Sequence, residues 1–353
     1  MEETGRQIKC PGCGATLEFD AKSQKLKCPY CDTEVDMEAF SSDEKKERNT
    51  RKKSEKKQTD QEKKEDVRVI TCKNCGAELF TDEYTTAAFC SYCGSSSLVE
   101  SRLSGELMPD YVIPFKMDKN QAVEEYKKWT KKGFLTPKVF RSQAVIDKIS
   151  GIYVPFWLYD YYGKIHAEGE CVNTRFSSDS ENDYTHRDYY YVCRDIEAQF
   201  VKVPADAAEK MDDTIMDKLE PFDYGELKPF QMEYLSGFLS ERYNMEAEAL
   251  EKRVEKRIDT YLNDLLKEEL HRYEEKHVKE NVILEKEKVR YVLLPVWMLN
   301  YRYQGKGYCF ALNGQTGKIV GDLPVSKGKA AGIFVLAFLI MYAIIFLIGG
   351  IIL

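Results

Sequence analysis

The sequence lacks the motifs that mark most known catalytic sites. Its 353 residues contain no Walker loop, no G-x-S-x-G, no H-E-x-x-H and no protein-kinase signature. The segment NGQTGK, residues 313–318, resembles a phosphate loop only superficially, because it lacks the four-residue spacer between glycines and a Ser or Thr after Lys318. These absences predict that the protein is not an enzyme and has no catalytic residues.

Histidine is also scarce. The chain has four histidines, and none stands in a metal-binding or catalytic motif: His166, His186, His271 and His277. Three cysteines lie outside any C-x-x-C pair: Cys171, Cys193 and Cys309. We interpret all of these residues as ordinary strand and surface positions, and we assign no residue to an organic cofactor.

A secretory signal is missing as well. The N-terminus reads MEETGRQIKC and has no apolar stretch, so we expect a reducing compartment, where disulfide frameworks are rare. A redox C-x-x-C usually stands alone beside a helix of a βαβ unit, and no such unit is visible. Metal binding therefore explains the remaining cysteines better than redox chemistry does.

What the sequence does contain is four C-x-x-C pairs in its first hundred residues. Their cysteines are Cys10, Cys13, Cys28, Cys31, Cys72, Cys75, Cys90 and Cys93. In each set of two pairs 14 residues separate the pairs, and CPGCGATLEFD of the first set aligns with CKNCGAELFTD of the second. Two such turns can offer four thiolates to one small cation, which predicts two zinc ribbons with one Zn²⁺ ion each. Disulfides and iron–sulfur clusters are the alternatives.

The residue after the second cysteine of a pair also carries information. It is glycine in three of the four turns, including Gly14 and Gly76, and it is Asp32 in the remaining one. A positive φ at this position turns backbone amides toward the sulfur atoms, and glycine adopts it without strain.

The C-terminus is the other readable end of the chain. Residues 330–353 run for 24 positions without a charge, and as a helix they would span about 36 Å, more than the roughly 30 Å hydrocarbon layer of a membrane. Lys327 and Lys329 precede this run and no basic residue follows it, so the positive-inside rule places residues 1–329 in the cytoplasm. The sequence thus predicts a single-pass protein of the cell membrane, with a transmembrane tail anchor over 327–353 and the lipid bilayer as a partner.

Composition divides the rest of the chain. The first ribbon is predicted over 1–40 and the second over 70–105, and residues 41–69 between them hold only two apolar side chains. Such a segment cannot bury surface, so we expect a charged linker, either coil or solvated helix, with a basic docking tract as the alternative. Residues 106–326 have globular composition and enough length for a packed body.

The body contains an internal repeat. IYVPFWLYDYYGK at 152–164 resembles VLLPVWMLNYRYQGK at 292–306, and IPFKM at 113–117 resembles KPFQM at 228–232. Each half would then consist of a Pro-Phe segment, a helix and a Trp-bearing strand that leads into a hairpin. The predicted halves are 106–205 and 206–326. The predicted fold class is α+β, with two β zinc ribbons, a repeated body and one transmembrane helix.

Local signals place several elements within this plan. Asp118 and Gln121 predict a capping box, and Gly133 predicts the end of the helix that follows it. The polar tip at 177–183 and Asn313–Gly314 predict hairpin turns. A charged helix is predicted over 245–278 from apolar residues at helical spacing: Leu250, Val254, Ile258, Tyr261, Leu265 and Tyr273.

Charge bears on what the ribbons contact. Residues 1–40 hold 5 Lys/Arg against 8 Asp/Glu, and residues 70–105 hold 2 against 4. Nucleic-acid modules ordinarily present a basic face that displaces counterions from phosphates. The acidic ribbons therefore disfavour nucleic acid as a partner and favour proteins.

Several stretches together resemble one family. They are CPGCGATLEFD, CKNCGAELFTDE, LSGELMPDYVIPFKMDK, KMDDTIMDKLEPFDY, LLPVWMLNYRYQGK and LNGQTGKIVGDLPV. Over nearly its whole length the chain is similar to bacterial zinc-ribbon proteins that carry transcription-factor-type zinc-ribbon or primosomal-helicase-like labels. The resemblance implies a membrane anchor and an association with phage-shock-type envelope stress systems and their scaffold proteins. It transfers the eight ribbon cysteines as metal ligands but no helicase activity, because nucleotide-binding motifs are missing.

The predicted function is that of a membrane-anchored cytoplasmic adaptor, whose zinc ribbons recruit protein partners to the membrane. The resemblance adds a role in the envelope stress response. The alternative function is that of a nucleic-acid-binding zinc-ribbon protein linked to replication or transcription.

Overall fold

The computed structural model describes residues 9–37, 67–72, 78–81, 98–103, 108–209, 211–241 and 243–352. In this part of the chain 42% of the residues lie in strands and 29% in helices. The protein is therefore mostly β-sheet, which corrects the predicted α+β class. The difference arises because two strands of the body continue for 29 residues each, well beyond the apolar segments that signalled them.

The short N-terminal strands are β1 (Glu18–Asp20), β2 (Lys25–Lys27), β3 (Glu34–Val35), β4 (Val67–Cys72), β5 (Glu78–Thr81) and β6 (Leu98–Leu103). The body strands are β7 (Tyr111–Val112), β8 (Ser150–Ser178), β9 (Asp183–Asp206), β10 (Lys228–Pro229), β11 (Leu239–Glu241), β12 (Glu275–Tyr303), β13 (Lys306–Asn313) and β14 (Ile319–Gly321). The helices are α2 (Lys119–Lys132), α3 (Gln143–Ile146), α4 (Asp213–Leu219), α5 (Ala247–Glu269) and α6 (Lys327–Ile352), with 3₁₀ turns η1 (Lys138–Arg141), η2 (Tyr224–Glu226) and η3 (Met232–Leu235).

The large sheet is organised around its two longest strands, β8 and β12, which pair antiparallel. Along the sheet the order is β10-β7-β12-β8-β11-β5-β4-β6, and β13 and β9 also pair with β12 and β8. β7 runs parallel to β12, and β11 runs parallel to β8. β10 and β5 then pair antiparallel with β7 and β11. The two sides of the central pair are thus alike. On each side a parallel strand comes first and an antiparallel strand second, which is β10 on one side and β5 on the other.

The central ladder relates the two halves by an approximate two-fold axis. Pro155 of β8 lies opposite Leu293 of β12. Its repeat counterpart, Pro295 of β12, lies opposite Tyr153 of β8. Reciprocal pairing of this kind is what a two-fold axis between two antiparallel strands produces.

The flanking strands correct the upstream part of the predicted repeat. β7 pairs with β12 at the repeat position at which β11 pairs with β8. Tyr111 of β7 therefore corresponds to Leu239 of β11. Segment 113–117 therefore corresponds to 241–245. It does not correspond to 228–232, because the strand at the start of that segment pairs directly with β7.

The two repeat tryptophans make matching hydrogen bonds. Trp157 Nε1 donates to the backbone oxygen of Met245 at 2.9 Å, and Trp297 Nε1 donates to that of Met117 at 3.0 Å. Met117 and Met245 are equivalent in the two halves, and each directly precedes the N-cap of a helix, α2 or α5. Each indole thus joins a strand of one half to a segment of the other.

The core beside the axis is aromatic. The ring of Phe115 stacks on Phe238 at 4.2 Å between centroids and meets Tyr153 and Trp297 edge-on at 5.0 and 5.2 Å. All four side chains are buried. Aromatic pairs of this geometry contribute about 0.5–1.5 kcal/mol each beyond the burial of their surface.

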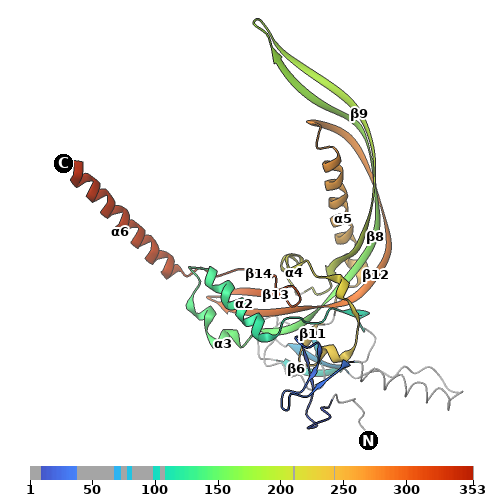
Figure 1. Ribbon diagram of the computed structural model, residues 1–353, viewed down its shortest axis with the longest axis vertical. Coiled ribbons are helices and arrows are strands. Elements are labelled where there is room, and N and C mark those ends of the chain that lie inside the picture. The colour runs from blue at the N-terminus through green and yellow to red at the C-terminus, as the bar shows by residue number, and fades with distance from the viewer. Residues whose placement is uncertain are drawn as a thin grey trace, which may run out of the picture.

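Beyond the body, β8, β9 and β12 continue as a curved arm (Figure 1). We define the arm as β8 and β9 from Tyr161 to Phe200, together with β12 from Glu275 to Lys286. Helix α5 covers one face of it with an apolar stripe. The stripe consists of Leu250, Val254, Ile258, Leu262 and Leu266.

Helix α5 is shorter than the predicted helix over 245–278. The chain from Glu275 onward pairs with β8 as strand β12, and helical structure ends at residue 269. Tyr261 and Leu265, predicted for the apolar face, are exposed. The buried stripe instead continues in steps of four residues through Leu262 and Leu266.

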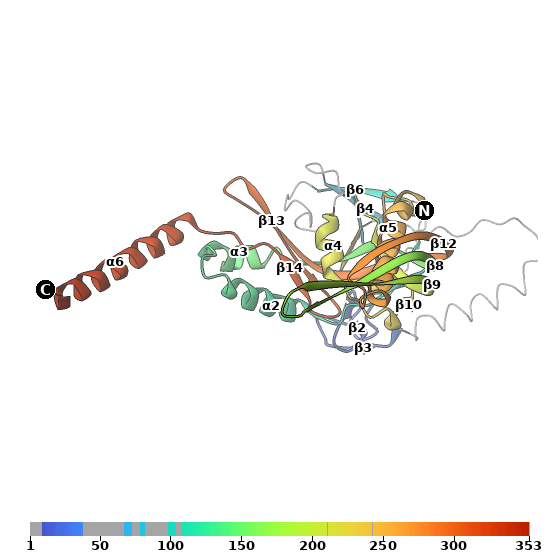
Figure 2. The same ribbon diagram turned by 90° about the horizontal axis from the view of Figure 1, so that it is seen from above.

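Helix α6 leaves the body at the C-terminus as an isolated helix (Figures 1 and 2). Among the residues that the structure describes, no helix is both long enough and apolar enough to cross a membrane.

This finding contradicts the predicted transmembrane tail anchor over 327–353. The predicted cell-membrane localisation with a cytoplasmic bulk is corrected with it.

Several local predictions are confirmed. Asp118 caps α2 with a complete capping box, and Gly133 is its C-cap. The tip at 177–183 joins β8 to β9. Asn313 ends β13 and begins the turn into β14, in which the positive φ falls on Gly317.

The tryptophan bonds give the first prediction. Trp157→Phe and Trp297→Phe each remove one partly buried N–H···O bond, so each should lower the free energy of unfolding by about 1–2 kcal/mol. Trp129→Phe is the matched control, because that indole donates no such bond in the described structure. Chemical denaturation checks this, and a large cost for only one of the two repeat variants would contradict the equivalence of the halves.

Candidate metal centre

The first ribbon brings four cysteines together from two turns of the same geometry. In one turn, Gly14 N donates to the backbone oxygen of Cys10 at 2.9 Å. In the other, Asp32 N donates to that of Cys28 at 3.0 Å. In each turn the backbone amide of the first cysteine donates a second hydrogen bond, which closes the turn. The two turns therefore present their cysteines in equivalent ways.

Both turns contain a residue in the left-handed region. Gly14 has φ +76° and Asp32 has φ +57°. Glycine takes this conformation freely, and aspartate is among the few residues with a side chain that tolerate it. The predicted positive φ is confirmed at Gly14, whereas Gly76 lies outside the described residues.

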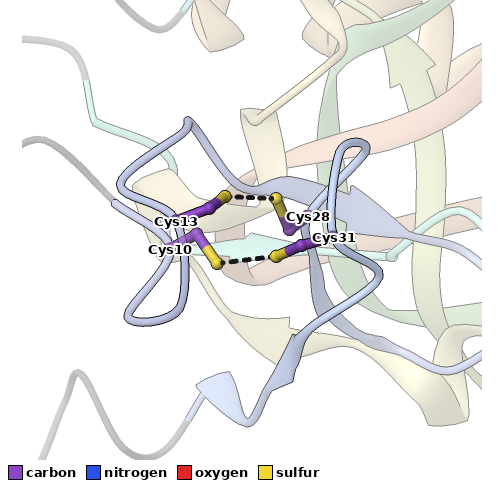
Figure 3. Close-up of side chains that lie close together, drawn as sticks. All are labelled: Cys10, Cys13, Cys28 and Cys31. Atoms are coloured by element: carbon purple, nitrogen blue, oxygen red, sulfur yellow. Dashed lines mark hydrogen bonds between the residues drawn. The ribbon is translucent and has the colours of Figure 1, made fainter.

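The four sulfur atoms face one another across the gap between the turns (Figure 3). The Sγ atoms of Cys10 and Cys31 are 3.4 Å apart, and those of Cys13 and Cys28 are 3.5 Å apart. All four ligand atoms lie within 4.8 Å of one another. The amide of Gly12 points at Cys10 Sγ from 3.4 Å. These cysteines are positioned to bind one metal ion.

The electrostatics of the cluster favour a cation. Burial raises the pKa of Cys10, but hydrogen bonds from backbone amides of its own turn lower it by more. The resulting pKa is about 6. An amide lowers the pKa of Cys13, but the sulfur atoms of Cys31 and Cys28 raise it to about 12. Four thiolates this close repel one another, so a cation is needed for all four to be ionised together.

The ribbon is packed against the body. The ring of Phe19 lies 5.3 Å from that of Tyr234 and 6.5 Å from that of Phe238. Cys10 and Cys28 belong to the same buried cluster as these rings. The metal centre therefore borders the aromatic core of the body.

Polar contacts fix the orientation of the ribbon. Lys22 Nζ lies 2.6 Å from Oδ2 of Asp118, which also caps α2. Gln24 Nε2 donates to the backbone oxygen of Phe115 at 2.7 Å. The exposed ion pair is worth little, whereas the bond to Phe115 connects the ribbon to the centre of the core.

Of the second predicted set, Cys72 is described, at the end of β4, and it is buried. Outside the described residues lie Cys75, Cys90 and Cys93. β4 already begins at Val67, so strand structure starts within the predicted linker 41–69. β5 pairs with β11, which joins the second ribbon segment to the body sheet.

A second group of potential ligands lies on the arm, where His166, Cys193 and Asp195 offer atoms within 4.8 Å of one another. His166 Nδ1 and Asp195 Oδ1 are 2.9 Å apart and form an exposed pair. The register of β8 and β9 creates this proximity, which residue spacing does not reveal. Among the other isolated cysteines, Cys171 is buried and burial raises the pKa of Cys309 to about 12, in keeping with structural roles.

The structure thus combines four cysteines positioned to bind one metal ion with a β body of two similar halves. No family model matches the chain, and no solved structure matches it. The chain is 39% identical over 315 residues to "Uncharacterized protein YdjG" of Bacillus subtilis (strain 168), a match that covers 74% of this chain and 92% of that protein. The chain therefore belongs to the same family as YdjG.

The left-handed residues give a prediction for the turns. Gly14→Ala places a Cβ in open space, so its cost is backbone strain alone, about 1–2 kcal/mol of ribbon stability. Asp32→Gly should change stability by less than about 1 kcal/mol, whereas β-branched Asp32→Val should cost about 2 kcal/mol. Competition with a metal chelator and chemical denaturation measure both effects. Equal stability of the Gly and Val variants would contradict this account of the turn.

Removal of a ligand gives a second prediction. Cys10→Ser should lose one equivalent of bound metal, because a three-thiolate site holds the ion less tightly. Since Cys10 borders the body core, the melting temperature of the body should fall as well. Cys309→Ser, in β13 of the body, is the control and should retain the wild-type metal content, because Cys309 belongs to neither group of potential ligands. Elemental analysis would refute the assignment if Cys10→Ser also retained it.

Proposed function

We propose that this protein is a zinc-stabilised adaptor that binds protein partners and catalyses no reaction. The four cysteines of the first ribbon hold one zinc ion, and Cys72, Cys75, Cys90 and Cys93 hold a second. The metal shapes the ribbons, and exposed surfaces elsewhere on the chain make the contacts with partners.

The donor set supports zinc. A tetrahedral Zn²⁺ with Zn–S bonds of about 2.3 Å spaces its ligands about 3.8 Å apart. The observed sulfur separations, from 3.4 Å to at most 4.8 Å, bracket this value. Four thiolates complete a tetrahedral shell and leave no position for substrate, which is typical of structural zinc.

The observation that carries the adaptor role is the exposed apolar surface of α6. The side chain of Phe334 is 74% exposed and that of Phe338, four residues further along the same face, is 54% exposed, on a helix that projects away from the body (Figure 2). Contiguous apolar surface of this kind marks a site of protein interaction in a folded protein. A helix that places its apolar side chains in a groove of a partner is a recurring mode of recognition.

Charge supports a protein partner over nucleic acid. The first ribbon is acidic, and a zinc ion with four thiolates adds a further charge of −2. Phosphate backbones are repelled by such a surface. From the family resemblance, scaffold proteins of phage-shock-type stress systems are the partner class that we propose.

Affinity purification of the full chain tests this function, with identification of both proteins and nucleic acids that co-elute. The wild type should recover a specific protein, and the double variant Phe334→Ser/Phe338→Ser should recover at least tenfold less of it, by the loss of about 2 kcal/mol or more of apolar contact. Val325→Ser is the matched control, since Val325 is exposed but precedes the helix.

Two results would count against the adaptor. Recovery of nucleic acid alone, with salt-dependent binding by the full chain, would favour the replication or transcription role instead. Undiminished recovery of the protein by the α6 variant would show that α6 is not the contact surface.

A further inference from the structure

We propose that two copies of this protein pair through the free edge of β9, antiparallel and centred on Tyr191. The second copy would extend the arm into a continuous sheet across the dimer. This inference goes beyond the adaptor role and depends neither on bound metal nor on α6.

The edge of β9 is open. β9 pairs with β8 along its whole length of 24 residues, and no other described strand pairs with it. Helix α5 packs on a face of the arm, and it is not a strand that could pair with this edge (Figure 1). An open edge presents a row of unpaired backbone donors and acceptors, which another strand can satisfy.

The two edges of the arm differ in how they are protected. The outer edge belongs to β12, whose arm segment EKHVKENVILEK is rich in Lys and Glu, the residues that keep edges from pairing. The middle of β9 reads RDYYYVCRD from Arg187 to Asp195, with three consecutive tyrosines. The β9 edge therefore lacks the protection that the β12 edge has.

The geometry of antiparallel pairing restricts the possible registers. Residues opposite each other must both direct their backbone groups toward the partner strand, or both away from it. For two identical strands this condition places the two-fold axis at a residue and not between two residues. Each candidate dimer is therefore defined by the one residue that faces itself.

Charge selects Tyr191 as that residue. With the axis there, Arg187 lies opposite Asp195 of the second copy and Asp188 lies opposite its Arg194, and symmetry produces each pair twice. Between residues 183 and 199 this register places no like charges opposite each other.

Neighbouring registers are worse. With the axis on Tyr190, Asp183 would lie opposite Glu197 of the second copy. With the axis on Val192, one kind of opposite-charge pair is left between residues 183 and 201, namely Arg187 opposite Glu197 of the second copy. The self-complementary pattern of RDYYYVCRD is therefore specific to one alignment of the strands.

Of the four charged side chains concerned, Asp188 pairs with Arg175 at 2.8 Å and Arg194 lies 3.9 Å from Glu269, so these two would exchange pairs within the chain for pairs across the axis. Arg187 is exposed and forms no ion pair with any residue that the structure describes. Asp195 contacts His166 through Oδ1, which leaves Oδ2 for a second cation. Tyr191 is 75% exposed and Tyr189 59% exposed on the same side of the strand. Across the axis Tyr191 would meet its own copy, and aromatic cross-strand pairs stabilise sheets.

Sedimentation of the full-length 40.9 kDa chain over a range of concentrations tests the dimer. Arg187→Asp alone, or Asp195→Arg alone, turns two attractive cross-strand pairs into repulsive ones and should weaken dimerisation by roughly 30-fold. A mixture of the two variants should recover the dimer as a heterodimer, because the charges then match again. Lys279→Asp, on the β12 edge, is the control and should leave the dimer unchanged.

Crosslinking tests the register independently. Tyr191→Cys/Cys193→Ser should form a covalent dimer on mild oxidation, because the new thiol faces its own copy, whereas Gln199→Cys/Cys193→Ser should not. A wild-type chain that stays monomeric at all concentrations would overturn the proposal. A dimer that resists both charge variants, or crosslinks equally at 191 and 199, would also overturn it, since another surface must then hold the copies together.

Discussion

The antiparallel pairing of β8 with β12 is the constraint on which the rest of the structure depends. The two strands stay paired with each other from the body into the arm. Both flanking strands, β7 and β11, attach to it in parallel, and both hairpins, β8–β9 and β12–β13, start from it. Because the two strands come from opposite halves of the repeat, neither half can complete its sheet alone. The body is therefore a single cooperative unit in spite of its internal repeat.

The metal centre and this unit share one core. Phe115, Phe238 and Trp297 close the body beside the two-fold axis, and Phe19 of the ribbon packs against Phe238. A ribbon of this size has too small an apolar interior to fold without its metal. Its surface against the body is nevertheless apolar, so loss of the metal exposes part of the body core to water. Metal binding thus stabilises more of the chain than the ribbon itself.

Features encoded at short range could be predicted from the sequence, and those encoded by strand register could not. Cysteine turns, the capping box at Asp118 and the tip at 177–183 depend on residues within a few positions of one another. β8 escaped recognition as a 29-residue strand because both of its faces are buried near the body, which removes the alternation that signals a strand. The docking of the ribbon, the equivalence of 113–117 with 241–245 and the closeness of His166 to Asp195 all depend on pairing between distant segments. The uncharged C-terminal run, judged by composition alone, led to a membrane span that the described helix does not support.

The point at which the halves diverge along β8 and β12 is informative. Pro155 and Pro295 define the correspondence of the halves, so the end of β12 at Tyr303 corresponds to Gly163 of β8. In the second half the chain turns back there into β13, whereas in the first half β8 continues to Ser178 before it turns. The body is already closed at this point, so the extension adds little to the central core, and α5 is needed to cover one of its faces. An element of this length that the core does not require is best explained by a role in contacts outside the chain, and its unprotected β9 edge is where such a contact would form.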